Sequence, residues 1–231
     1  LHRMTDNGTI TVTLPDGTTM EAERGTTPLQ IAERIGPRLA KAAVVAEVGG
    51  RLVDLHRPLD EDAELRLLTD RDPDALEVHR HSTAHLMAQA VQRLWPDTRV
   101  TIGPVIEGGF FYDFDRTPPF TPEDFDAIEA EMAKIVAEDH GIERQEIGRD
   151  EAIALFREKN EPYKVEVIED LPEGETLTLY RQGEWVDLCR GPHVPGTGRL
   201  GHFKLLKAAG AYWRGDERNR MLSRIYGTAF F

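Results

Sequence analysis

The feature that most constrains the fold is a change in hydrophobic pattern across residues 69–75, which read TDRDPDA. Before this segment the chain shows short stretches of strand-like alternation, and after it the first long apolar pattern has helical spacing. The segment itself is polar and contains a proline, which favours a domain boundary. We therefore expect two domains, over residues 1–70 and 71–231, because 231 residues suffice for two ordinary hydrophobic cores.

The first seventy residues predict a small β-rich domain. TITVTLPDGTTMEAE alternates on both sides of Asp16-Gly17, which is a strong hairpin signal. TTPLQIAERIG predicts a helix with Pro28 at its first position and Gly36 at its exit. AAVVAEVGGRLVDL predicts a second hairpin, and ELRLLT predicts a closing strand. This set matches a small mixed β-grasp layout, in which we find no catalytic group of residues.

The remainder of the chain predicts an α+β domain with a mixed or antiparallel sheet and packed helices. Apolar residues keep helical spacing over residues 78–95, and Pro96 ends that helix. A second helix is expected after Thr121 as its cap, and a shorter one over residues 152–158. Strand-like stretches are TRVTIGPV, GFFYDFD, YKVEVIE, TLTLYR and EWVDLC.

The charge of the chain limits the classes of partner. A formal net charge of -13 argues against a protein that coats nucleic acid through bulk electrostatics, so any RNA contact must be local. One stretch, residues 199–224, is rich in cations and is either an RNA-contacting patch or a solvated basic face. Its cations are Arg199, Lys204, Lys207, Arg214, Arg218, Arg220 and Arg224, against the acids Asp216 and Glu217.

Two further features bear on the setting of the protein. No apolar run reaches the length needed to cross a bilayer, so no membrane partner is expected. Cys189 is the single cysteine, which excludes an internal disulfide and suits a reducing cytoplasm. The opening LHRMT carries a methionine only at Met4 and is interpreted as an expression scar.

The candidate catalytic or metal-binding residues lie in the stretches HSTAH and CRGPH. His81 and His85 are spaced i, i+4, which brings both imidazoles to one side of a helix. No glutamate lies between them, which removes a zinc protease because that chemistry needs a general base there. A bent loop after Cys189 can return His193 toward it. These four side chains form a chemically complete tetrahedral zinc set, with structural histidines and a buried cysteine as the alternative.

Three other residues make a purely structural interpretation less attractive. Asp187 lies two residues before Cys189, and Tyr112 lies in the aromatic strand GFFYDFD. Lys164 in PYKVEV adds a cation, although a lysine on a strand would ordinarily face solvent.

At this point the residues carry a resemblance. The stretches HSTAHLMAQAVQRLWP, IGPVIEGGFFYDFD, YKV, VDLCRGPHVP and FKLLKAAGAYWRGD together resemble the amino-terminal half of bacterial threonyl-tRNA synthetases. Residues up to about 70 are similar to the TGS domain of that family and the rest to its editing domain. The resemblance implies that the aminoacylation domain, with its ATP and zinc sites, and the anticodon-binding domain are absent and that the chain is a fragment.

The resemblance also implies an activity. Editing in this family hydrolyses serine from mischarged tRNA(Thr), and no metal is required, although a related module of alanyl-tRNA synthetases uses a similar residue set to hold zinc. His81 and Lys164 are expected to activate and orient water, and Asp187 to hold the seryl ammonium. The residues expected to line the acyl and adenosine pocket are His85, Tyr112, Cys189 and His193. The full-length family enzyme is a cytoplasmic homodimer, whereas this fragment is expected to be a monomer.

Three alternatives stay open. Cys189 can act as a covalent nucleophile, because a thiolate beside an imidazole attacks esters. The chain can instead be a zinc-stabilised RNA-binding module without turnover, with His81, His85, Cys189 and His193 as ligands. Finally, HVPGTGRLGHFKLL also resembles alanyl-type trans-editing enzymes, although the leading β-grasp layout and GAYWRGD favour the threonyl family.

Overall fold

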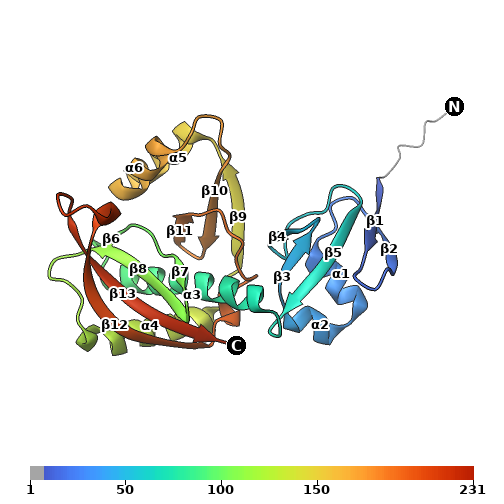
Figure 1. Cartoon of the computed structure of the whole chain (residues 1–231), viewed down its shortest axis with the longest axis horizontal. Helices are drawn as coiled ribbons and strands as arrows, with labels where there is room; N and C mark the ends of the chain where they lie inside the picture. The colour runs from blue at the N-terminus through green and yellow to red at the C-terminus, as the bar shows by residue number, and fades with distance from the viewer. Residues whose placement is uncertain (1–7) are drawn as a thin grey trace. The chain divides into compact units, whose positions relative to one another are not determined.

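The structure is a computed structural model that describes residues 8–231 (Figure 1). The opening LHRMT, interpreted above as an expression scar, lies outside these residues. The chain forms two compact units. One comprises the described residues up to Val78 together with Gly191–Pro195, and the other comprises His79–Arg190 together with Gly196–Phe231.

The first unit has the expected β-grasp architecture. Its sheet has the order β2-β1-β5-β3-β4, in which β1 and β5 are parallel and the other neighbours are antiparallel. The unit also contains two helices, and the second of them, over Pro37–Ala42, was not predicted from the sequence. The elements are β1 (Thr9–Thr13), β2 (Thr19–Glu23), α1 (Pro28–Ile35), α2 (Pro37–Ala42), β3 (Ala43–Val48), β4 (Arg51–Val53) and β5 (Ala63–Thr69).

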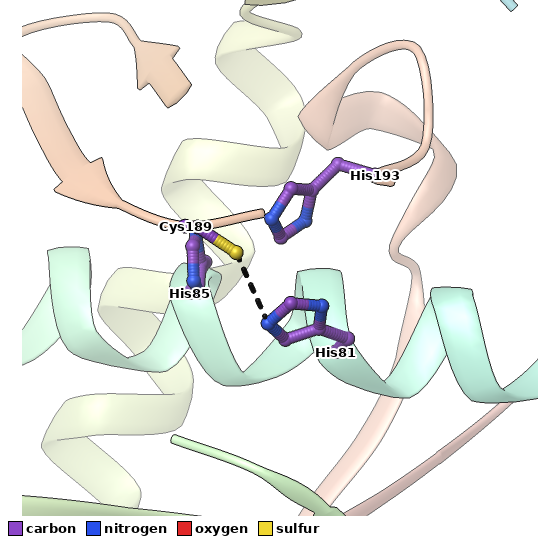
Figure 2. Close-up of side chains that lie close together, drawn as sticks. All are labelled: His81, His85, Cys189 and His193. Carbon is purple, nitrogen blue, oxygen red and sulfur yellow. Dashed lines mark hydrogen bonds between the residues drawn. The ribbon is translucent and has the colours of Figure 1, made fainter. Parts of the chain in front are cut away.

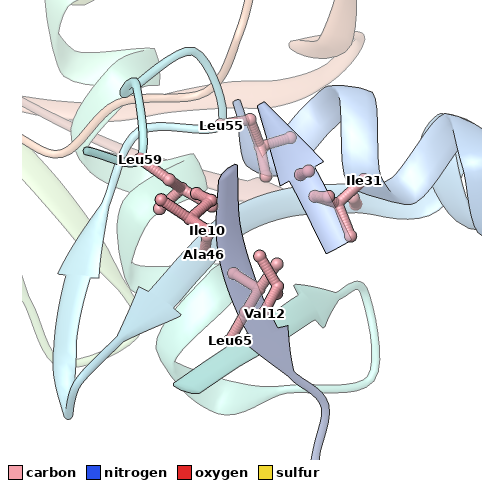
Figure 3. Packing of buried hydrophobic residues seen from close by; sticks show 9 residues of the cluster. Ile10, Val12, Ile31, Ala46, Leu55, Leu59 and Leu65 are labelled. Atoms are coloured by element: carbon pink, nitrogen blue, oxygen red, sulfur yellow. The ribbon is translucent and has the colours of Figure 1, made fainter. Parts of the chain in front are cut away.

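Local chemistry explains these boundaries. Asp16 accepts a hydrogen bond from the Thr18 backbone amide at 2.9 Å, and Gly17 takes a positive φ of 84°, which closes the β1–β2 turn. Thr27 and Gln30 form a reciprocal capping box at the start of α1. The helix covers an apolar face of the sheet (Figure 3). The buried cluster contains Ile10, Val12, Ala22, Ile31, Ala43, Ala46, Leu55, Leu59 and Leu65.

The second unit contains two antiparallel sheets with helices, as expected for an α+β domain (Figure 1). One sheet has the order β11-β10-β9, and the other has the order β12-β13-β8-β6 with β7 paired to β8. The strands are β6 (Arg99–Val100), β7 (Val105–Ile106), β8 (Gly109–Asp115), β9 (Ile142–Ile147), β10 (Leu177–Gln182), β11 (Trp185–Leu188), β12 (His202–Tyr212) and β13 (Met221–Phe230). The helices are α3 (Pro73–Leu94), of which the residues from His79 onward belong to this unit, α4 (Phe125–Glu138), α5 (Arg149–Glu158) and α6 (Pro162–Asp170).

The prediction of a strand at YKVEVIE was wrong, because these residues lie in α6. Pro162 occupies the first turn, where a proline needs no amide partner. Lys164, Val165 and Ile168 are buried, and their spacing places them on one helix face. Val165 and Ile168 pack with α5 against strands β10 and β11. The buried cluster contains Ala152, Phe156, Val165, Ile168, Leu177, Leu179 and Val186. The β-branched alternation of the stretch imitated a strand.

Other differences concern strands and helix ends. TRVTIGPV is strand only at β6 and at the first residue of β7, and β9 with the long β12–β13 hairpin was not predicted. Most of β12 is exposed, so its residues lack the alternation that marks a half-buried strand. The helix expected over residues 78–95 begins earlier, at Pro73. Within the described part of the chain, no helix has both the length and the apolar character of a membrane span.

A cluster of charges ties α3 to α4 and to the β10–β11 turn. The Arg93 guanidinium lies 2.5 Å from a Glu184 carboxylate oxygen and 2.8 Å from one of Glu138. These hydrogen bonds lower the pKa of both carboxyls to about 2. Glu138 also contacts His140 at 2.6 Å. The cluster therefore fixes the C-terminal end of α3, and its side chains take no part in the candidate site.

Candidate active site

Helix α3 carries the first two candidate residues. The His81 and His85 rings face each other edge to face, with centroids 5.0 Å apart. His85 is buried, whereas His81 is half-buried. The expected placement of both imidazoles on one side of a helix is thus confirmed.

Cys189 follows β11 and lies beside this pair (Figure 2). Its Sγ is 3.5 Å from His81 Nε2. The backbone around the thiol is fixed by Thr178, whose carbonyl accepts from the Cys189 amide at 3.1 Å and whose hydroxyl donates to the Cys189 carbonyl. In the loop that follows, the His193 amide donates to Asp54 at 2.7 Å. The side-chain ligand atoms of His81, His85, Cys189 and His193 all lie within 4.8 Å of one another.

A buried carboxylate connects three more groups. Asp187 on β11 is 1% exposed, and its Oδ1 lies 2.6 Å from the Lys164 ammonium. Its Oδ2 accepts from the Tyr112 hydroxyl at 2.9 Å and lies 3.4 Å from His85 Nε2. Lys164 is 3% exposed and Tyr112 is fully buried. Groups from β8, α6 and α3 therefore converge on one carboxylate of β11, and Lys164 faces inward rather than toward solvent.

Burial sets the protonation of the groups around this carboxylate. Burial lowers the pKa of His81, with a smaller opposing effect of Asp187 and a further lowering by Lys164. Burial also raises the pKa of Tyr112 well above its usual value, reinforced by the charge of Asp187 and by the hydrogen bond to it. His81 is therefore a neutral imidazole near pH 7 and can accept a proton, while Tyr112 stays a hydrogen-bond donor.

Two neighbours fix the position of the Tyr112 ring. Phe114 stacks on it with centroids 5.0 Å apart. Gly103 approaches it so closely that a Cβ at this position would lie 2.2 Å from the ring. The glycine of the TIGP loop is thus required by the close approach of backbone to phenol, which keeps the hydroxyl aimed at Asp187.

One neighbour of the site was missed by sequence reasoning. Trp185 lies edge-on against His85, with ring centroids 5.2 Å apart, and its Nε1 donates to Gln92 at 2.7 Å. The signal was present, because Trp185 and Asp187 are two residues apart on β11 and so point to the same face of the sheet.

Comparison with known proteins agrees with this architecture. Residues 10–69 match the model of the TGS domain, and residues 177–226 match the threonyl and alanyl tRNA synthetase second additional domain. The chain carries both domains. The part matched to the second additional domain contains Asp187, Cys189 and His193, whereas the residues on α3, β8 and α6 precede it.

The chain is similar to threonine–tRNA ligases, which confirms the resemblance inferred from the motifs. The chain is 60% identical over 219 residues to that of Methylococcus capsulatus, covering 95% of this chain and 34% of the relative. It is 60% identical over 222 residues to that of Maricaulis maris, covering 96% of this chain and 34% of the relative. The chain therefore spans about a third of the length of the curated relatives it matches.

The basic stretch of the second additional domain is mostly charge-paired. Lys207 contacts a ring, with its Nζ 4.5 Å from the Tyr226 centroid. The acid pairs are Lys204 with Glu129, Arg214 with Asp170, Arg218 with Asp216, Arg220 with Asp115 and Arg224 with Asp113. These pairs reduce the positive charge available to RNA, which favours the interpretation as a solvated face.

The donor set on α3 and after β11 fits zinc in its chemistry. Imidazole nitrogens and a thiolate are the ligands of structural zinc sites, and the Cys189–His81 separation of 3.5 Å is compatible with two ligands of one tetrahedral ion. Asp187 beside His85 is also the kind of carboxylate that orients a metal-bound histidine. If zinc binds, its ligands are His81, His85, Cys189 and His193.

Proposed function

We propose that this chain hydrolyses the ester that joins serine to tRNA(Thr), and that it does so without a metal. The observation that carries the proposal is the convergence of Lys164, Tyr112 and His85 on the Asp187 carboxylate, next to His81. The match to the second additional domain and the similarity to threonine–tRNA ligases support an RNA-linked aminoacyl ester as substrate.

The selectivity follows from the difference between two amino acids. Serine is threonine without one methyl group, and a missing methyl is worth only about 1 to 3 kcal/mol in a binding pocket. A synthetic site shaped for threonine therefore cannot exclude serine. A second site of opposite selectivity solves the problem, since it admits the seryl ester and rejects the threonyl ester by a clash with the extra methyl.

The reaction needs few protein groups because the ester is already activated. His81 accepts a proton from a water molecule, whose oxygen attacks the seryl carbonyl carbon. Lys164 donates to the developing oxyanion or to the attacking water, since an ammonium has three donors and Asp187 uses one. The ester carbon–oxygen bond then breaks, the ribose oxygen takes up the proton, and the products are serine and tRNA.

The remaining residues bind the substrate. Asp187 holds the seryl ammonium, with a carboxylate whose position Tyr112 fixes at 2.9 Å. His85, with Trp185 at its edge, forms the wall of the acyl pocket. Cys189 and His193 extend that lining toward the terminal adenosine.

A deacylation assay on chelator-treated protein tests the proposal. Release of serine from seryl-tRNA(Thr) is expected to exceed release of threonine from threonyl-tRNA(Thr) by about 10 to 200-fold, the discrimination that one methyl group supports. Seryl-tRNA(Ala) serves as a third substrate, because the matched family model also covers alanyl enzymes. Faster hydrolysis of seryl-tRNA(Ala) would replace the threonyl proposal by an alanyl-type one, and no hydrolysis of any substrate would remove both.

Replacing Cys189 by alanine is expected to leave seryl-tRNA deacylation within about threefold of wild type. The thiol contacts His81, but the proposed mechanism gives the attack to water and uses Cys189 only as lining. Single-turnover deacylation measures this directly. A loss of about 10³-fold or more would instead identify the thiol as a nucleophile, because removing a covalent nucleophile has effects of that size or larger.

The cluster of four possible zinc ligands favours a second candidate function, that of a zinc-stabilised RNA-binding module without turnover. In that case zinc would supply folding free energy, because ligands that converge on an ion stabilise the folded chain. Stoichiometric zinc by elemental analysis, together with unfolding under chelator, would favour this candidate. A folded chelator-treated chain that still hydrolyses seryl-tRNA would eliminate it.

A further inference from the structure

Glu161 is a buried acid that the proposed mechanism does not use. It immediately precedes α6 and is 7% exposed. One carboxylate oxygen accepts from Gln92 Nε2 at 2.7 Å, and the other accepts from the Val100 backbone amide at 3.1 Å. One side chain thus joins the start of α6 to α3 and to β6.

Glu161 is connected both to Lys164 and to the residues around His85. Lys164 lies three residues later, within the first turn of α6, and the Glu161 carbonyl accepts from the Val165 amide at 3.3 Å. On the other side, Gln92 Oε1 accepts from Trp185 Nε1 at 2.7 Å, and Trp185 lies against His85. Glu161 is therefore linked to Lys164 through the first turn of α6, and to His85 through Gln92 and Trp185.

We infer that Glu161 is a positioning residue of this site: its carboxylate fixes the first turn of α6 and thereby holds the Lys164 ammonium against Asp187. The inference rests on the proposed deacylation for its effect on rate. The attachment of α6 to α3 and β6 by Glu161 does not depend on the proposed function.

The chemistry of the partners explains why an ionised acid is needed here. Both partners present N–H donors, and a carboxylate accepts on each oxygen, whereas a glutamine would place its own donor against one of them. Gln92 cannot reverse its amide without cost, because its Oε1 already accepts from Trp185 and its Nε2 also donates to the Thr98 carbonyl at 2.8 Å. Loss of the charge therefore leaves a buried donor unsatisfied.

The ionisation of Glu161 falls in an accessible pH range. Burial raises its pKa to about 6, while the hydrogen bonds from Gln92 and Val100 and the charge of Lys164 lower it, and Asp187 raises it. Tyr112 also faces this group electrostatically but stays protonated. Glu161 is therefore ionised above about pH 6 and becomes protonated below it. Because the protonated acid no longer fixes α6, the wild-type deacylation rate is expected to fall below about pH 6.

The test compares Glu161→Gln with wild type in seryl-tRNA(Thr) deacylation between pH 5 and 8. We expect kcat at pH 7.5 to fall about 10- to 100-fold with KM within about twofold, because small misplacement of a catalytic group has effects of this size. The ratio of the wild-type rate to the Glu161→Gln rate should approach one below about pH 6, since glutamine resembles the protonated acid at every pH and protonation of His81 affects both proteins alike. A kcat within about twofold of wild type at pH 7.5, or a ratio of rates that does not change with pH, would overturn the inference.

A second measurement separates this inference from the proposed function. Hydrogen exchange of the α6 amides should be about tenfold faster in Glu161→Gln, while α4 amides remain unchanged. Glu138→Gln is the matched control, because Glu138 is also a carboxylate bonded to α3, through Arg93, and its other partner is His140 rather than a residue of α6. If wild type shows no deacylation, the proposed function fails and the α6 exchange alone decides the inference, with unchanged exchange overturning it.

Glu161→Asp covers the case in which the glutamine variant does not fold. Aspartate keeps the charge but is one methylene shorter, so it cannot reach both donors with α6 in place. We expect kcat to fall about tenfold or more while a break near pH 6 is retained. An aspartate variant with the wild-type kcat would overturn the inference.

Discussion

Replacing Lys164 by methionine is expected to lower the rate of seryl-tRNA deacylation by about 10²- to 10³-fold, the usual effect of removing one oxyanion donor. The same change is expected to lower the free energy of unfolding by about 3 to 5 kcal/mol, because it leaves the Asp187 carboxylate buried without its counter-charge. Single-turnover kinetics and urea denaturation measure the two effects separately. Both should be large, since Lys164 and Asp187 are almost completely buried.

The double variant Lys164→Met with Asp187→Asn is the matched control. It removes both charges at once, so most of the lost free energy of unfolding should return, because neutral replacement of a buried pair is far less costly than breaking it. Deacylation should stay as low as in the single variant. Recovery of the rate together with stability would show that Lys164 acts only by holding the fold, which would end its catalytic assignment.

Replacing His81 by alanine is expected to lower kcat for deacylation by about 10²- to 10⁴-fold, the range for loss of a general base. KM should change little, because the imidazole acts on water rather than on the bound RNA. Stability should change little as well, since His81 is only half-buried. The measurement is deacylation at pH 7.5, where burial, by lowering the pKa of His81, keeps the wild-type ring neutral and able to accept a proton.

His202→Ala is the control for His81, since it removes an exposed imidazole from β12 in the same unit. It should deacylate at the wild-type rate. Addition of free imidazole to His81→Ala should restore part of the lost rate, because a small base can enter the space left by the ring. Wild-type kcat in His81→Ala would contradict the assignment of His81 as the general base.

Local patterns predicted those parts of the site that lie close together in the sequence. The i, i+4 spacing of His81 and His85 fixed their relation on α3, and the hairpin signal at Asp16-Gly17 fixed β1 and β2. Both depend on contacts within a few residues. The resemblance to a known family supplied the remaining site residues, which spacing alone did not connect.

The parts that could not be predicted depend on contacts between distant residues. Lys164 was expected on a strand, because the alternation of YKVEVIE imitates one, and only the packing of α6 on its sheet shows which face is buried. The meeting of Tyr112 and Lys164 at Asp187 joins three elements with no periodic relation to one another. The same holds for Glu161, whose partners lie on α3 and β6.

The ion pair between Lys164 and Asp187 bears on how a reaction cycle would end. In the substrate-free chain each charge satisfies the other, so departure of a product strands neither of them in an apolar surrounding. Free serine is a zwitterion and would have to exchange both of its charges against a pair that is already complete. Under the proposed function, competition from the cell's own amino acid pool is thereby kept weak, and proofreading continues while serine is abundant.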